Sequence, residues 1–279
     1  MYRLPLGQWI NSGVEWLLLY FGRIFDIFTD FITTITEYLG AGLEFIPWYV
    51  FILLCAILAW RVKGWRLAIG CLIGLLLIYN LELWPSFLDT LVLVLISSVI
   101  SLAIGIPLGI LGARSNGFHK VLSPVLDFMQ TMPSFVYLIP ALMFFSLGAV
   151  SAIFATVIFS MPPVIRLTDL GIRQVPADLI EVGEAFGSSS FQMLWKIQLP
   201  LALPTIMAGI NQTMMLSLSM VVISAMIGAQ GLGAGVLEGI AQMNIGKGFE
   251  FGLAVVILAM ILDRLSQGVA SNSRAAIKK

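Results

Sequence analysis

The chain has 279 residues, of which 59% are hydrophobic and 11% are charged. A soluble globular domain carries about 25% charged residues, so this composition predicts a membrane protein. The 15 basic and 15 acidic residues cancel to a formal net charge of zero, which gives no reason to expect a nucleic acid as a partner.

The residues capable of metal-binding or redox chemistry are few and isolated. Cys55 and Cys71 both lie inside apolar runs and are expected to be small core residues. His119, the single histidine, stands beside Lys120 in a short loop and is expected to be solvated. The sequence therefore predicts no metal site and no catalytic imidazole.

Residues 7–39 predict an amphipathic helix, because apolar residues recur on one side at spacings of three and four. The apolar side carries Ile24, Phe28, Phe31, Ile35 and Tyr38. We expect the N-terminal segment, residues 1–44, to lie in the membrane interface. Residues 14–21 are apolar enough that partial insertion remains an alternative.

Seven later segments are candidate transmembrane helices, since a bilayer core needs about 20 mostly apolar residues. They are expected at residues 45–60, 67–81, 87–111, 121–145, 150–170, 201–227 and 251–265. The first two are short additional helices within residues 45–84, and tryptophans bracket them as in interfacial aromatic belts. Pro124, Pro133 and Pro140 predict a kink or a break in the fourth.

The basic residues are distributed unevenly between the two sides of this predicted bundle. With residues 181–200 assigned to the cytoplasm, 12 Lys and Arg fall inside and three fall outside. The inside set is Arg61, Lys63, Arg66, Arg114, Lys120, Arg166, Arg173, Lys196, Arg264, Arg274, Lys278 and Lys279, and the outside set is Arg3, Arg23 and Lys247. This bias predicts a multi-pass cell-membrane protein with its N-terminus outside and its C-terminus in the cytoplasm.

The stretch from Glu181 to Pro200 is a polar island in this apolar sequence. Gly187 is expected to take a positive φ between two short helices. Apolar side chains exposed in such a loop need a partner surface, so the island predicts a docking site, with an ordinary cytoplasmic loop as the alternative. These side chains are Phe186, Phe191, Met193, Leu194 and Trp195.

Five motifs carry a resemblance to a known family. The pattern Glu181, Gly187, Ile197 and Leu199-Pro200 resembles the EAA loop of binding-protein-dependent ABC importer permeases, although Val182-Gly183 stands where that loop has two alanines. The surrounding motifs resemble the glycine betaine/proline betaine permeases: QTMPSFVYLIP at 130–140, MPPVIRL at 161–167, QVPADLIE at 174–181 and AGINQTMM at 208–215. The resemblance covers roughly residues 85–268.

The resemblance implies an all-α polytopic membrane protein of about seven transmembrane helices, preceded by the amphipathic helix. Residues 85–268 would form a type I ABC importer core with a coupling loop at 177–200, and residues 269–279 would be a cytoplasmic tail. The coupling residues would be Glu181, Gly187, Phe191, Leu194, Ile197, Leu199 and Pro200. The implied partners are a second copy of the chain, two ATPase subunits that hold ATP and Mg, and a separate extracellular substrate-binding protein.

The implied function is import of glycine betaine or a related compatible solute by alternating access. No GxxxxGK[ST] phosphate loop and no HExxH or GxSxG signature occurs, so the chain is expected neither to bind a cofactor nor to be an enzyme. Choline or another small solute is an alternative substrate. An osmotically gated channel and a membrane enzyme are alternatives from other classes.

Polar and aromatic residues of the fourth and sixth spans are candidates for the translocation path. Asp127 and Gln130 lie about two turns from the cytoplasmic side, where a carboxylate is costly unless it faces protein or water. Asn211 and Gln212 fall at a similar depth and are expected to be their partners, either as a gate or as a packing contact. Phe135 and Tyr137, followed by Phe144 and Phe145, are expected to attract a quaternary ammonium solute through cation–π contacts.

Overall fold

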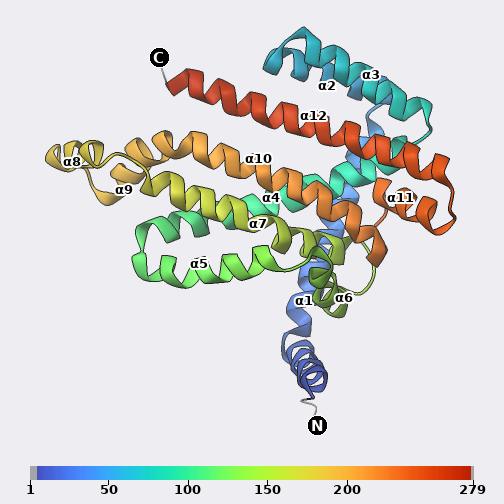
Figure 1. Cartoon of the computed structure of the whole chain (residues 1–279), viewed down its shortest axis with the longest axis horizontal. Helices are drawn as coiled ribbons and strands as arrows, with labels where there is room; N and C mark the ends of the chain where they lie inside the picture. Colours follow the sequence, from blue (N-terminus) through green and yellow to red (C-terminus); the bar gives the residue numbers. More distant parts are fainter. Residues whose placement is uncertain (1–4, 278–279) are drawn as a thin grey trace.

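The computed structural model describes residues 5–277, and every regular element among them is helical (Figure 1). In chain order these are α1 (Leu6–Phe45), α2 (Trp48–Lys63), α3 (Trp65–Asn80), α4 (Trp84–Arg114), α5 (Asn116–Thr131), η1 (Ser134–Tyr137), α6 (Leu138–Phe145), α7 (Ala149–Arg173), α8 (Ala177–Ala185), α9 (Ser190–Met193), η2 (Leu194–Gln198), α10 (Leu199–Ile223), η3 (Ser224–Ile227), α11 (Leu232–Ala241) and α12 (Ile245–Ile277). The tail expected at 269–279 thus continues α12 as far as Ile277.

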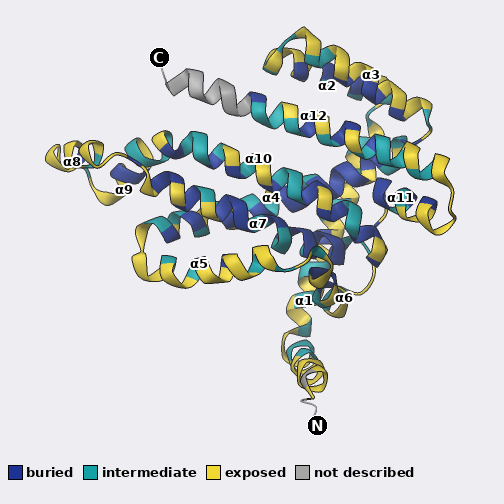
Figure 2. Ribbon diagram, viewed as in Figure 1, coloured by how far each residue is buried: buried dark blue, intermediate teal, exposed yellow. Residues whose placement is uncertain are grey.

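The helices α4, α7 and α10 pack against one another at the centre of the bundle, where Figure 2 shows most of the buried residues. Glycines allow these helices to approach closely. A Cβ on Gly105 of α4 would lie 2.5 Å from Val164 Cγ1 of α7, and one on Gly109 would lie 2.7 Å from the Ile165 carbonyl oxygen. The centre of the bundle is therefore a tightly packed unit.

The fourth predicted span is broken, as its prolines predict. The segments 116–131 and 134–145 meet at an angle of 109°. Pro133 stands at the break, where it has no N–H to continue the helix and favours extended backbone in the residue before it. The helix α5 therefore runs along the bundle, while η1 and α6 turn across its end (Figure 1).

The first helix is longer than the sequence predicts and runs across the bundle rather than along it (Figure 1). It has 40 residues, which corresponds to a length of about 60 Å. The side facing the bundle carries Phe25, Phe28, Ile32 and Ile35, so the predicted apolar face is only partly the packed one. Ile24, Phe31 and Tyr38 are exposed. They remain available to lipid, and we keep the interfacial placement of residues 1–44 as a prediction.

Within residues 5–277, four helices are long and apolar enough to cross a bilayer, or up to six if each of two bent pairs counts as one span. The sequence predicts about seven. The count of four leaves out α2, α3 and the broken segment of α5 and α6, whereas the count of six leaves out only α3 and includes α2 together with α1. The two short helices are α2 and α3. Each has 16 residues, which gives about 24 Å against a bilayer core of about 30 Å. The two form a hairpin at Gly64 that packs on α12, where a Cβ on Gly74 would lie 2.7 Å from Ile257 Cγ2.

The turns of the bundle fall at two ends, and the charge distribution predicts which of the two is cytoplasmic. Figure 1 shows the α2–α3 turn, the α4–α5 turn, α8 and α9 at one end, together with the end of α12. The α3–α4 turn, α6 and α11 lie at the opposite end. The segment 177–200 is therefore at the end that carries most of the basic residues, which is the predicted cytoplasmic end.

Candidate functional site: the coupling loop and the polar pairs of the bundle

The turn after α8 has the geometry that the sequence predicts for Gly187. Its φ is +74°, which is in the left-handed region that favours glycine. The Gly187 N–H donates to the Glu184 carbonyl at 2.8 Å, and the Ser188 N–H donates to the Gly183 carbonyl at 3.0 Å. These two bonds form a Schellman motif, which ends α8 and redirects the chain.

The chain then enters α9 through a capping box and continues as a π-helix. The Ser189 Oγ accepts from the Gln192 N–H, and the Gln192 side chain accepts from the Ser189 N–H. The π-helix η2 spans Leu194–Gln198 and runs directly into α10. A Cβ on Gly183 would lie 2.7 Å from Met193 Cε and 2.8 Å from Ile197 Cδ1, so α8 packs closely against η2.

The loop exposes some of its predicted apolar side chains and buries others. Phe186 is 87% exposed and Phe191 is 64% exposed, and Trp195 is exposed beside them with its ring 5.9 Å from that of Phe191. Leu194 is only 4% exposed and packs in a cluster with Ile172 and its neighbours. The prediction that Leu194, like Met193, is presented to a partner is therefore wrong for this conformation.

The remaining coupling candidates lie around this exposed surface. Glu181 is exposed on α8, and Ile197, Leu199 and Pro200 are half-buried where η2 joins α10. These three connect the loop to a helix that spans the membrane. What binds the loop stays a proposal.

Asp127 pairs with a residue that the sequence does not predict. The Arg166 guanidinium on α7 donates to its carboxylate at 2.5 Å. Both side chains are largely exposed on the protomer, as is Gln130 on the same helix. An ion pair in a transmembrane bundle is costly against lipid, so this face of α5 and α7 is suited to water or to protein.

Asn211 and Gln212 do not contact Asp127, which corrects the predicted pairing. The Asn211 side-chain amide donates to Asp263 of α12 at 3.3 Å and accepts from the Ser266 hydroxyl. Gln212 is exposed. Asn211 therefore holds α10 against α12, which is the packing alternative considered for it.

The aromatic candidates for the solute path separate into exposed and packed rings. Phe135 is exposed. Tyr137 is buried, its hydroxyl donates to the Met129 carbonyl, and its ring packs against Phe159. Phe144 stacks on Phe25 of α1 at 4.8 Å, and Phe145 also packs against α1, so in this conformation these two rings connect helices.

His119 is not a solvated loop residue. Its Nδ1 lies 2.5 Å from the carboxylate of Asp169, and its Nε2 lies 3.4 Å from the Ser123 hydroxyl. Sequence reasoning did not find this pair because 50 residues separate its members. No group of three or more His, Cys, Asp or Glu within residues 5–277 is arranged to hold a metal ion.

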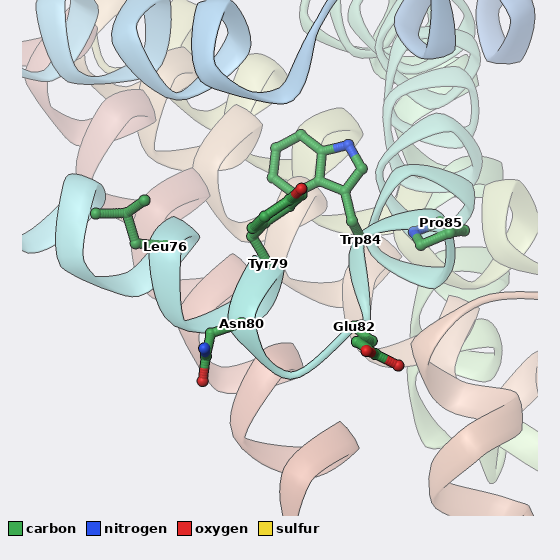
Figure 3. A pocket seen from close by; sticks show the side chains of 6 residues that line it. All are labelled: Leu76, Tyr79, Asn80, Glu82, Trp84 and Pro85. Carbon is green, nitrogen blue, oxygen red and sulfur yellow. The ribbon is translucent and has the colours of Figure 1, made fainter.

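An open pocket of about 810 Å³ lies at the turn between α3 and α4 (Figure 3). Asn80 and Glu82 point away from the rings of Tyr79 and Trp84 in this view. The Tyr79 ring is already stacked on Trp48, with 4.1 Å between the ring centroids. Because the polar and aromatic groups do not converge, we do not place the solute path here.

One ion pair joins the short helix α11 to the start of α12. The Lys247 ammonium lies 2.6 Å from the Glu238 carboxylate. Its hydrogen bond and its charge lower the pKa of Glu238 below the ordinary value of 4.5. This pair lies at the end of the bundle opposite the coupling loop (Figure 1).

Comparison with known proteins identifies the family. The model of the family described as binding-protein-dependent transport system inner membrane component matches residues 105–273. The chain is 48% identical over 267 residues to the glycine betaine transport system permease protein OpuAB of Bacillus subtilis, covering 96% of this chain and 95% of that protein. It is 49% identical over 276 residues to the glycine betaine/carnitine transport permease protein GbuB of Listeria monocytogenes, covering 98% of this chain and 97% of that protein.

A third relative is the glycine betaine/proline betaine transport system permease protein ProW of Escherichia coli, 46% identical over 98% of this chain and 77% of that protein. The similarity thus extends well before residue 85. Among solved structures, a chain of the inward-facing MetNI methionine ABC transporter matches 66% of this chain and 93% of its own length with a TM-score of 0.62 and 22% identity, which shows a shared type I importer permease fold. The chain belongs to the family of binding-protein-dependent transport system inner membrane components.

Proposed function

We propose that this chain is the permease subunit of an ATP-driven, binding-protein-dependent importer of glycine betaine or a related compatible solute. The observation that carries the substrate class is the similarity over at least 96% of the chain to permeases whose names specify glycine betaine. Carnitine is the second candidate, because it is also named for one of these relatives. Choline remains the alternative raised by the sequence.

The loop from α8 to η2 is the proposed docking site for the ATPase. Phe186, Phe191 and Trp195 are exposed at the predicted cytoplasmic end, and large apolar side chains in such a position favour a protein partner. The loop is stiffened by the Schellman motif and the capping box, so docking orders few additional residues. ATP and Mg would be held by that partner, and this chain would supply the connection to the membrane helices.

A second copy of the chain is the proposed partner within the membrane. The helix α5 exposes Val121, Val125 and Phe128 beside the Asp127–Arg166 ion pair. Lipid would suit the apolar side chains but not the ion pair, whereas a path between two copies would suit both. We therefore place the solute path on this face, with Gln130, Phe135 and Gln212 as further exposed candidates.

Uptake of radiolabelled glycine betaine into proteoliposomes tests this function. The permease is reconstituted with its ATPase and binding protein, and each component is omitted in turn. Import that requires all three components is the expected result. Flux without the ATPase would favour the channel alternative, and uptake of choline or carnitine but not glycine betaine would correct the substrate.

A further inference from the structure

Asp169 is a buried carboxylate that accepts two charge-assisted hydrogen bonds near the C-terminal end of α7. The residue is 6% exposed. His119 Nδ1 of α5 lies 2.5 Å from its Oδ2, and Arg173 Nε lies 2.7 Å from its Oδ1. Because an ionised carboxylate only accepts, the imidazole must donate from Nδ1. A carboxylate buried to this extent depends on such partners.

Arg173 extends this cluster to two more elements. Its two terminal nitrogens donate to the side-chain oxygen of Asn116 and to the carbonyl of Gly112, each at 2.8 Å. Asn116 is the first residue of α5, and Gly112 lies in the last turn of α4. A Cβ on Gly112 would lie 3.4 Å from Asp169 Cγ, so the helices meet closely here.

The cluster lies directly before the coupling loop. Arg173 is the last residue of α7, and α8 begins at Ala177. Val175 between them is buried, so the connection is held against the bundle. A displacement of α8 would therefore reach Asp169 and Arg173 before it reached the rest of α7.

The helix α5 needs this cluster because it has little apolar packing of its own. Of its residues 116–131, only Leu126 is buried. Its other ion pair with α7 is Asp127–Arg166, and Arg166 lies three residues, or about 4.5 Å, from Asp169 along α7. Polar contacts thus determine where α5 lies, and α5 carries the proposed path residues.

We propose that Asp169 is a positioning residue that, with His119 and Arg173, transmits movement of the coupling loop to α5. This inference rests on the proposed function, because the movement comes from the ATPase. Without the cluster, α8 and α5 would move independently, and ATP would be hydrolysed without a matching rearrangement of the path. The contacts of Asp169 with His119 and Arg173 lie within this chain, so they do not depend on which solute or partner it binds.

The test compares uptake with ATP hydrolysis in the reconstituted complex. Asp169→Asn keeps the size of the side chain and removes its charge. His119→Ala removes the contact between Asp169 and α5, while the bond from Arg173 to Asn116 remains. Both variants are expected to lower the solute imported per ATP by about fivefold or more, at the lower end of typical coupling between sites. Arg173→Lys keeps the positive charge but loses the planar guanidinium that donates in several directions. Its ratio of solute imported to ATP hydrolysed is expected to lie between those of these variants and that of the parent.

Lys247→Gln is the matched control, since it removes an ion pair at the opposite end and should leave the ratio unchanged. An unchanged ratio in His119→Ala, or uptake and hydrolysis that fall in proportion, would overturn the inference. If Asp169→Asn fails to assemble, His119→Ala still decides, because it retains the Asp169–Arg173 pair.

Hydrogen exchange separates failure of this inference from failure of the proposed function. Amides of residues 116–121 in the permease alone are expected to exchange faster in Asp169→Asn than in the parent. Equal exchange rates in the variant and the parent would refute the role of this cluster in positioning α5. A parent complex that does not import the solute would instead refute the proposed function.

Discussion

Gly187→Val tests whether the turn between α8 and α9 is recognised by the ATPase. Gly187 has φ +74°, and a Cβ at this position would meet no other atom within 4 Å. The penalty is therefore confined to the backbone. It amounts to about 1–2 kcal/mol for a residue with a side chain in the left-handed region, and a β-branched residue lies at the upper end.

This penalty translates into a loss of affinity. If only the native turn docks, the apparent dissociation constant rises as the fraction of native turns falls. A change of 1–2 kcal/mol corresponds to about a 5- to 30-fold weaker complex. Because the turn is on the surface, the melting temperature of the permease should change little.

The assay is a titration of the permease in lipid nanodiscs with the ATPase, followed by uptake in proteoliposomes. Gly187→Asn is the matched control, since asparagine adopts the left-handed conformation more readily than other residues with a side chain. It should bind almost as well as the parent. A valine variant with the parent's affinity and rate of import would refute the docking role of this turn.

Phe186→Ala is expected to weaken ATPase binding without lowering the melting temperature, whereas Leu194→Ala should destabilise the permease by about 2–5 kcal/mol; equal melting temperatures of the two variants would contradict the observed burial. Asp127→Asn should slow import because it leaves Arg166 without a partner, and exchange of the two charges in a double variant should restore part of the rate; no recovery would argue against a role for the pair. The lowered pKa of Glu238 means that its ion pair stabilises the protein fully above its ordinary value of 4.5 and ceases to do so as the pH falls through the lowered value. The melting temperatures of the parent and Glu238→Gln should therefore converge in acid, and a pH-independent difference would contradict this.

Local patterns predicted much of this structure. Hydropathy located α4, α7, α10 and α12, because the length of an apolar span is fixed by the bilayer. The three prolines of the fourth span predicted a kink or a break, which the structure places at Pro133, and Gly187 predicted the positive φ. Each of these depends on a few neighbouring residues, which is why a single sequence was sufficient.

Contacts between distant segments were not predictable in the same way. Asp127 was assigned to Asn211, but 39 residues separate it from its partner Arg166, and no spacing rule links them. Asp169 and Arg173 do have the spacing of four that favours an ion pair on one helix. That signal was present in the sequence, while the contribution of His119 depends on how α5 folds back on α7.

The orientation of the coupling side chains was missed for a different reason. The sequence predicts that Leu194 shares the exposed surface of Phe191, because both are apolar side chains in a polar loop. It begins the π-helix, in which the turn holds more residues than in an α-helix, and it faces the core instead. A helix face predicted from 3.6 residues per turn therefore does not extend through a π-helical segment.

The same π-helix gives the loop a way to turn without a hinge. If the hydrogen bonds of Leu194–Gln198 moved by one residue to the α-helical register, the preceding residues would rotate by about 100° and advance by about 1.5 Å relative to α10. Such a shift would rotate the exposed rings of Phe186 and Phe191 about the axis of α10 without bending α10.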